Sequence, residues 1–352
     1  MVQDDNKRLA QFELLRILAM LGVLMNHVFN YGLHIYDDFA IDTTSAMGFL
    51  LWSLLEVMKL LALPSVNCYV LITGYFLADK TQLRLKGIWK VWSITWFYAV
   101  TIYLLAVSIG LTPFTWSEML RHATPLCSNS YWFVTSYIAL MLLAPLLSWG
   151  LQRLSLRQYQ LALAVGAIVC FQPLMGWLVM DDQQILLFVY LFLIGGYIKR
   201  YGGATPHVQR KALWLSALTL LLMYAYTVYK NIHFGHDSFV VYAMAYHGLV
   251  LPLSVGIFLC FKDMQIRSNV LKKTINSFAP LCFSVYIIHT QSIVHERLWN
   301  ASSYVFFHLV PTAAIPLLCI LICVCVFLFC CGIDYCRSTI LQFLASKVSK
   351  QS

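Results

Sequence analysis

Residues 16–35 read RILAMLGVLMNHVFNYGLHI, an apolar run that contains one arginine and two histidines. A helix needs about 20 mainly apolar residues to cross the hydrocarbon core of a bilayer, and this run is that long. The run therefore predicts a membrane-spanning helix. Arg16 and His27 are eleven residues apart. Because eleven residues make about three helical turns, we expect both side chains on one face, with His27 roughly 16 Å further along the axis.

Runs of the same kind recur along the whole chain. Of the 352 residues, 60% are hydrophobic and 11% are charged, with a mean hydropathy of +0.73, which excludes a water-soluble fold. We expect an all-α integral membrane protein with about ten transmembrane helices in a single domain, with a core at 12–333 and a short cytoplasmic tail at 334–352. The ten predicted segments are 17–35, 47–78, 88–111, 132–151, 159–180, 185–198, 212–229, 239–261, 278–299 and 304–331.

The second of these segments is too long for one straight crossing. A helix over all of 47–78 would rise about 48 Å, and Pro64 lies near its middle. We therefore expect one crossing, at about 63–78, preceded by a helix at the outer interface that is broken at the proline.

The distribution of charge supports this topology. With the N-terminus inside, twenty of the 24 basic residues fall on the cytoplasmic side, so both termini are expected there. The loops around Asp38, Asp182 and Asp237 are then external. The net charge of +9 is interpreted as cytoplasmic anchoring, and the expected partner is the lipid bilayer rather than a nucleic acid. The sequence does not indicate an oligomeric state.

Ionisable groups within spans are costly and indicate function. His27 has the side chain best suited to proton transfer near neutrality, and Arg16 at the inner mouth suits a phosphate or carboxylate. The alternative is that Arg16 only reaches the headgroups while His27 bonds a neighbouring helix. His247 and His289 are expected at a depth similar to that of His27. The chain has no His-x₃-His or clustered carboxylates, so we expect no metal site.

Other polar and aromatic residues are weaker candidates. Glu56 and Lys59, three residues apart, can pair on one helix face, either to neutralise each other or to line an acceptor site. Trp132, Trp299 and Tyr304 lie near the outer ends of spans, where aromatic-belt anchoring is the simplest expectation, although sugar stacking would use the same residues.

Four fragments in order carry a resemblance to a known family. The Arg16-(ten residues)-His27 spacing resembles the hallmark of acyltransferase family 3, bacterial membrane enzymes that O-acylate cell-surface polysaccharides. Leu71-Ile-Thr-Gly-Tyr-Phe-Leu77, Tyr131-Trp-Phe133 and Val285-Tyr-Ile-Ile-His289 are similar to later segments of that family. The family commonly has arginines three apart after the Gly-aromatic segment, whereas this chain has Arg84, Lys86 and Lys90 there. Lysine keeps the charge but lacks the planar fork of arginine.

The resemblance implies a multi-pass protein of the bacterial inner (plasma) membrane that transfers an acyl group to a glycan. The donor would be cytoplasmic acyl-CoA, with acetyl-CoA expected, and the protein would hold no tightly bound cofactor. The donor would bind Arg16, Arg84, Lys86 and Lys90. His27 would act with Arg16 in catalysis, as a general base or as an acyl carrier. The residues expected to bind the acceptor or to support the site are His289, Trp132, Glu56 and Lys59. A transporter or exporter of a glycan or small molecule is the alternative, since mid-membrane histidines also suit alternating access.

Overall fold

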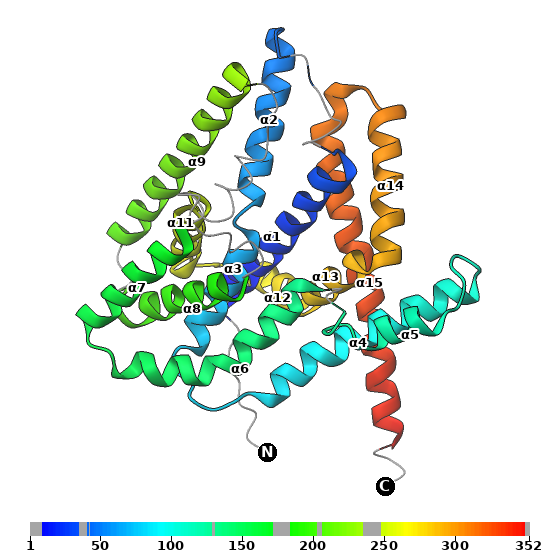
Figure 1. The fold of residues 1–352 in the computed structure, drawn as a ribbon, viewed down its shortest axis with the longest axis horizontal. Helices are drawn as coiled ribbons and strands as arrows, with labels where there is room; N and C mark the ends of the chain where they lie inside the picture. Colours follow the sequence, from blue (N-terminus) through cyan, green and yellow to red (C-terminus); the bar gives the residue numbers. More distant parts are fainter. Residues whose placement is uncertain are drawn as a thin grey trace. The chain divides into compact units, whose positions relative to one another are not determined.

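The structure, a computed structural model, describes residues 9–34, 41, 43–128, 131–171, 184–202, 206–234 and 248–348. Within these ranges the regular structure is helical and no strand occurs, as Figure 1 shows. The predicted all-α class is therefore confirmed for this part of the chain. His247 and the loops around Asp38, Asp182 and Asp237 lie outside the described residues.

The described part of the chain contains the following helices. In chain order they are α1 Ala10–His27, the π-helical η1 Val28–Gly32, α2 Ala46–Ala62, α3 Ser65–Leu77, α4 Leu85–Ser108, α5 Trp116–Ala123, α6 Trp132–Arg153, α7 Leu156–Phe171, α8 Gln184–Tyr201, α9 Pro206–Phe234, α11 Val250–Lys262, α12 Asn269–Phe278, η3 Ala279–Leu281, α13 Cys282–Thr290, α14 Ser292–His308, η4 Thr312–Ala314 and α15 Ile315–Val348. The segment predicted as a cytoplasmic tail continues α15 as far as Val348.

Several of these helices are long and apolar enough to cross a membrane. Among the described residues there are six such helices, or seven if the bent pair at 269–290 and 292–308 forms one span. α11 is apolar but shorter. Multi-pass character is thus present, whereas the predicted count of ten spans is not confirmed.

The predicted break at Pro64 is present, since α2 ends at Ala62 and α3 begins at Ser65. Proline has no backbone N–H to continue the ladder, although Leu63 before it keeps helical dihedral angles (φ −55°, ψ −41°). The Leu63 N–H still bonds the carbonyl of Lys59 at 3.2 Å, so the interruption is short and 46–77 remains one candidate span.

Two predicted segments need correction. The run 278–299 is not one straight helix, because the axis bends by 80° between α13 and α14. Gln291 is extended there (φ −60°, ψ 129°), and its side-chain oxygen accepts from the N–H groups of Ile293 and Val294, which restarts the helix. The run 304–331 is interrupted as well: α14 ends at His308, and α15 begins only at Ile315, after Pro311.

The chain forms two compact units, each built from segments far apart in sequence. Unit 1 comprises 1–33, 94–130 and 266–352, and unit 2 comprises 34–93 and 131–265. In unit 1, α13 packs on α15, and α1 packs on α12, α13 and α15, while α14 lies against η1. The side chains of Phe12, Leu24, Phe29 and Val285 are fully or almost fully buried and form part of its core.

Unit 2 is organised around a close crossing of α3 and α8. A Cβ placed on Gly74 would lie 2.5 Å from the carbonyl oxygen of Phe192, and one placed on Gly195 would lie 2.6 Å from that of Leu71. No side-chain carbon fits at these distances, so the two helix backbones touch directly. Glycine at both positions is what permits the crossing.

This crossing generates the first prediction. Gly74→Ala should push α3 away from α8 and destabilise the protein by about 1–3 kcal/mol, the usual cost of overpacking. Thermal unfolding in detergent, followed by tryptophan fluorescence, measures the effect. Gly150→Ala in α6 is the matched control, because nothing lies within 4 Å of a Cβ at that position. Equal midpoints for the two variants would contradict the predicted direct backbone contact.

Candidate active site

His27 lies where α1 stops being a regular helix. It is the last residue of α1, and the next five residues form the π-helical turn η1, in which the Leu33 N–H bonds the Val28 carbonyl at 2.8 Å. Single π-helical turns within helices are rare and are found mostly at functional sites. The ring of His27 is partly exposed, while Val28 and Phe29 beside it are fully buried.

His289 occupies a similar position at a second break. It is the penultimate residue of α13, immediately before the 80° bend at Gln291. Its side chain is 0% exposed. Broken helices inside a membrane protein are tolerated where neighbouring groups satisfy the freed backbone, and the Gln291 side chain does this for α14.

The two rings meet through a hydrogen bond. His289 Nε2 lies 3.2 Å from His27 Nδ1, and the ring centroids are 5.0 Å apart. His289 Nδ1 also lies 2.5 Å from the backbone carbonyl of Val285. The structure thus brings together the two histidines that the sequence singled out.

These contacts fix the tautomers of the neutral pair. A carbonyl oxygen only accepts, so His289 Nδ1 carries the proton that it donates to Val285. His289 Nε2 is then an acceptor, and His27 Nδ1 donates to it. The remaining nitrogen of His27, Nε2, keeps its lone pair. His289 therefore orients the ring of His27, as second partners orient histidines in metal sites and catalytic triads.

Three further side chains surround this pair. The ring of His295 lies 5.9 Å from that of His27 and 4.5 Å from that of Tyr31. The indole of Trp299 lies 6.1 Å from the ring of His27 and 6.4 Å from that of His289. Tyr31 is 43% exposed and Trp299 only 1%, so the cluster runs from an accessible edge to a buried interior.

The sequence did not reveal all of these residues. His295 is six residues after His289, and on a straight helix that spacing turns a side chain by roughly 240° to another face. The bend at Gln291 redirects α14, and the ring of His295 therefore lies beside that of His27.

Trp299, one turn after His295 on α14, was expected as an aromatic-belt anchor. That expectation is wrong, because its side chain is enclosed by histidine rings. Tyr31, four residues after His27, was discoverable by helical spacing.

Arg16 lies on the same helix as His27, as predicted, but it has a partner that the sequence analysis did not consider. Its guanidinium forms an ion pair with Glu13, one turn earlier on α1. The Arg16 side chain is 30% exposed and that of Glu13 is 10% exposed. An anionic ligand at Arg16 would therefore compete with a carboxylate that is already in place.

The other predicted site residues lie in unit 2. Glu56 and Lys59 pair on α2 at 2.7 Å and are buried, and Glu56 Oε2 has no hydrogen-bond partner in the described part of the chain. A buried carboxylate oxygen without a donor is costly, so this pair has capacity for one more hydrogen bond. Trp132, 38% exposed, begins α6.

The predicted basic cluster is accessible. Arg84 immediately precedes α4, and Lys86 and Lys90 lie in its first two turns; all three side chains are exposed. The first turn of α4 contains no acidic residue. Cations beside a helix N-terminus reinforce its positive end, and this combination favours anions.

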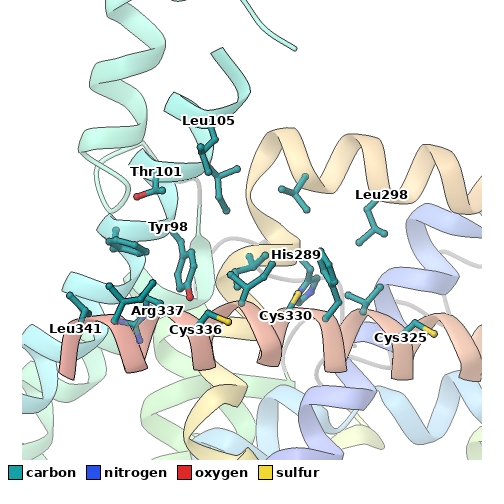
Figure 2. Close-up of a pocket in the computed structure, with 18 of the residues that line it drawn as sticks. Tyr98, Thr101, Leu105, His289, Leu298, Cys325, Cys330, Cys336, Arg337 and Leu341 are labelled. Atoms are coloured by element: carbon teal, nitrogen blue, oxygen red, sulfur yellow. The ribbon is translucent and has the colours of Figure 1, made fainter. Parts of the chain in front are cut away.

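An apolar groove runs along α15 in unit 1. It has a volume of about 990 Å³ between α4, α13, α14 and α15, with an almost wholly apolar wall. Figure 2 shows His289 in this wall near Cys330, with Arg337 further along α15 and Tyr98 of α4 beside Arg337. The Tyr98 hydroxyl donates to Asp334 at 2.7 Å, and Arg337 bonds the same carboxylate at 2.6 Å. The groove reaches His289 but does not include His27.

Metal binding is not indicated by the described side chains. Within the described ranges, no group of three or more His, Cys, Asp or Glu residues is arranged to hold a metal ion. The three histidines meet instead through a ring hydrogen bond and edge contacts.

One known protein family matches the chain. The sequence profile of the acyltransferase domain family, acyltransferase family 3, matches residues 9–333. The chain belongs to this family. No curated protein and no solved structure matches it. The matched range contains the histidine pair and nearly every described helix, so a membrane acyltransferase is the activity that family and fold together support.

The histidine pair generates the second prediction. His27 should be the neutral tautomer protonated at Nδ1, because His289 Nε2 accepts from that nitrogen. Solid-state ¹⁵N NMR of histidine-labelled protein, with His27→Gln to assign the signal, distinguishes the two tautomers. His289→Phe removes the acceptor and should release this preference. A His27 ring protonated at Nε2 in the unsubstituted protein would contradict the orientation.

Proposed function

We propose that this protein transfers an acyl group, with acetyl as the expected group, from cytoplasmic acyl-CoA to a hydroxyl of a cell-surface or lipid-linked glycan. The observation that carries the proposal is the oriented lone pair on His27 Nε2, held by the contact with His289 in a protein of this family. An imidazole with a lone pair on one nitrogen can accept a hydroxyl proton.

The reaction then needs one base. As the acceptor hydroxyl oxygen attacks the thioester carbonyl carbon, its proton passes to His27 Nε2 and an oxyanion forms. The oxyanion collapses, the carbon–sulfur bond breaks, and the CoA thiolate takes the proton from His27. The products are an ester and free CoA. While protonated, His27 still donates from Nδ1 to neutral His289, which stabilises the imidazolium.

A covalent route uses the same nitrogen. His27 Nε2 would attack the thioester carbonyl carbon, the carbon–sulfur bond would break with CoA leaving as the thiolate, and Nε2 would carry the acyl group. The glycan hydroxyl oxygen would then attack the same carbon, the carbon–nitrogen bond would break to restore the Nε2 lone pair, and the hydroxyl proton would end on the CoA thiolate. Acyl-enzyme that accumulates from labelled acetyl-CoA in the absence of a glycan identifies this route. If no acyl-enzyme accumulates while acetyl is still transferred to the glycan, the transfer is direct.

The donor is proposed to bind through its phosphates. Arg16 is close to the start of α1, and Arg84, Lys86 and Lys90 are exposed around the start of α4. Guanidinium and ammonium groups both bind phosphate, although only arginine does so with a planar fork. Binding at Arg16 would require the ligand to displace or share the bond to Glu13.

The acceptor is proposed to enter from the opposite side. Tyr31 and His295 form the accessible edge of the histidine cluster, and both offer hydrogen-bonding groups to a sugar. The α15 groove has almost no polar wall and suits hydrocarbon rather than a glycan. Glu56, Lys59 and Trp132 stay predictions for the acceptor side, with Glu56 Oε2 able to accept one hydroxyl.

The proposed setting is the inner membrane of a bacterium, with about ten spans and both termini in the cytoplasm. Its support is the charge distribution of the sequence, in which the basic residues gather in alternate loops. This topology gives Arg16 access to cytoplasmic acyl-CoA.

A transporter is the second candidate, and the bend at Gln291 is the observation that favours it. Discontinuous helices are common at the binding sites of secondary transporters. Glycan flux across a vesicle membrane without acyl transfer would support transport.

The third prediction tests the enzyme directly. Purified protein in liposomes should transfer labelled acetyl from acetyl-CoA to a glycan acceptor, and His27→Gln should lower turnover by about 10²-fold or more. Glutamine keeps a hydrogen-bonding side chain but cannot take up the proton. His308→Gln is the control, because this histidine is exposed on α14 and contacts Tyr304 rather than the cluster. Turnover of His27→Gln equal to that of this control would refute the catalytic assignment.

The fourth prediction concerns the donor. Arg16→Ala should raise the KM for acetyl-CoA about 10-fold or more, since a hydrogen bond to a charged group contributes about 1.5–3 kcal/mol. Glu13→Gln should lower it, because the change removes a negative charge beside the phosphates. Initial rates over a range of acetyl-CoA concentrations give both values. A KM that moves in the same direction in both variants would exclude phosphate binding at Arg16.

A further inference from the structure

The indole of Trp299 lies among the three histidine rings of the site. Its centroid is 6.1 Å from that of His27, 6.4 Å from that of His289 and 6.3 Å from that of His295. The interplanar angles are 83°, 89° and 73°, so each imidazole is roughly edge-on to the indole. The side chain is 1% exposed and therefore sealed from bulk water.

The indole N–H has nothing to bond. Among the described residues, Trp299 Nε1 is a buried polar atom without a hydrogen-bond partner. Buried tryptophan N–H groups usually find an acceptor, because a buried donor without one is costly. An unmet donor at this position indicates that the acceptor arrives with a ligand.

Neither His27 nor His289 can accept a hydrogen bond from the indole N–H unless the hydrogen bonds of the pair change. His289 donates through Nδ1 to Val285 and accepts at Nε2 from His27, so both of its nitrogens are occupied. The free lone pair of His27 Nε2 is the one that the proposed reaction uses. An oxygen atom of the substrate is then the natural partner of the indole N–H.

We propose that Trp299 Nε1–H donates a hydrogen bond to the carbonyl oxygen of the bound acyl group and to the oxyanion that this oxygen becomes, an assignment that rests on the proposed acyl transfer. The hydroxyl proton goes to His27 Nε2, the carbonyl electron pair moves onto the oxygen beside Trp299, and it returns when the carbon–sulfur bond breaks. A donor already in place in a dry site costs no reorganisation when charge develops. Trp299 is thus a catalytic residue that the sequence motifs do not contain.

The test replaces only the N–H. Trp299 is changed to 3-benzothienylalanine, an isostere in which sulfur takes the place of the indole N–H, and in parallel to phenylalanine. Trp52, a buried tryptophan of α2 outside the proposed site, receives the same isostere as the matched control. Acetyl transfer is measured as separate kcat and KM values, and the carbonyl stretch of bound ¹³C-labelled acetyl-CoA is recorded by infrared difference spectroscopy.

The expected result is a fall in kcat on the order of 10²-fold at Trp299 with little change in KM, as for loss of one oxyanion donor. The carbonyl stretch should move to higher frequency in the same variant, because the bond that weakens the carbonyl is gone. The Trp52 variant should change neither quantity.

Several outcomes would overturn the assignment. An unchanged carbonyl frequency at Trp299 shows that the indole bonds a water or a ring nitrogen, even if turnover falls through altered packing. Unchanged kcat and frequency together exclude any role for the N–H. If the unsubstituted protein neither binds acetyl-CoA nor transfers acetyl, the proposed function and this assignment are both overturned. If it transfers acetyl normally and the Trp299 isostere changes neither kcat nor the carbonyl frequency, only this assignment is overturned.

Discussion

The contact between His27 Nδ1 and His289 Nε2 is the constraint on which the rest of the site depends. Each ring sits at a point where its helix loses regular form, His27 before a π-helical turn and His289 before an 80° bend. Neither break is favourable by itself, because each disturbs a backbone hydrogen-bond ladder. Packing of α14 on η1 and of α13 on α1 and α15 holds both breaks in place. The tertiary fold, rather than local helix geometry, thus determines the orientation of the His27 ring.

Short-range sequence patterns predicted the structural elements that depend on neighbouring residues alone. The lengths of the apolar runs predicted helices, and the proline predicted the break at Pro64. The Arg16–His27 spacing held because both residues lie on one regular helix. The bend at Gln291 was missed, since glutamine carries no general signal for a helix break and its capping role appears only with the neighbouring N–H groups in place.

The candidate site divides in the same way. His27 and His289 could be predicted one by one, from residue type, depth and the family resemblance, while their hydrogen bond and tautomers could not. His295 and Trp299 entered the site through the bend, which no helical periodicity anticipates. Glu13 shows the opposite case, because its three-residue spacing from Arg16 already indicates an ion pair on one helix.

The hydrogen bond from His289 Nδ1 to the Val285 carbonyl limits the path that protons can take through the histidine pair. Two hydrogen-bonded histidines inside a candidate span could pass protons from one side of a membrane to the other and so dissipate a proton gradient. The carbonyl accepts a hydrogen bond but cannot carry a proton onward, so the chain of donors ends at Val285. Within the pair, His27 Nε2 is the nitrogen that neither of these two hydrogen bonds uses. Proton exchange between the pair and its surroundings therefore passes through that atom, while the Val285 carbonyl closes the other end.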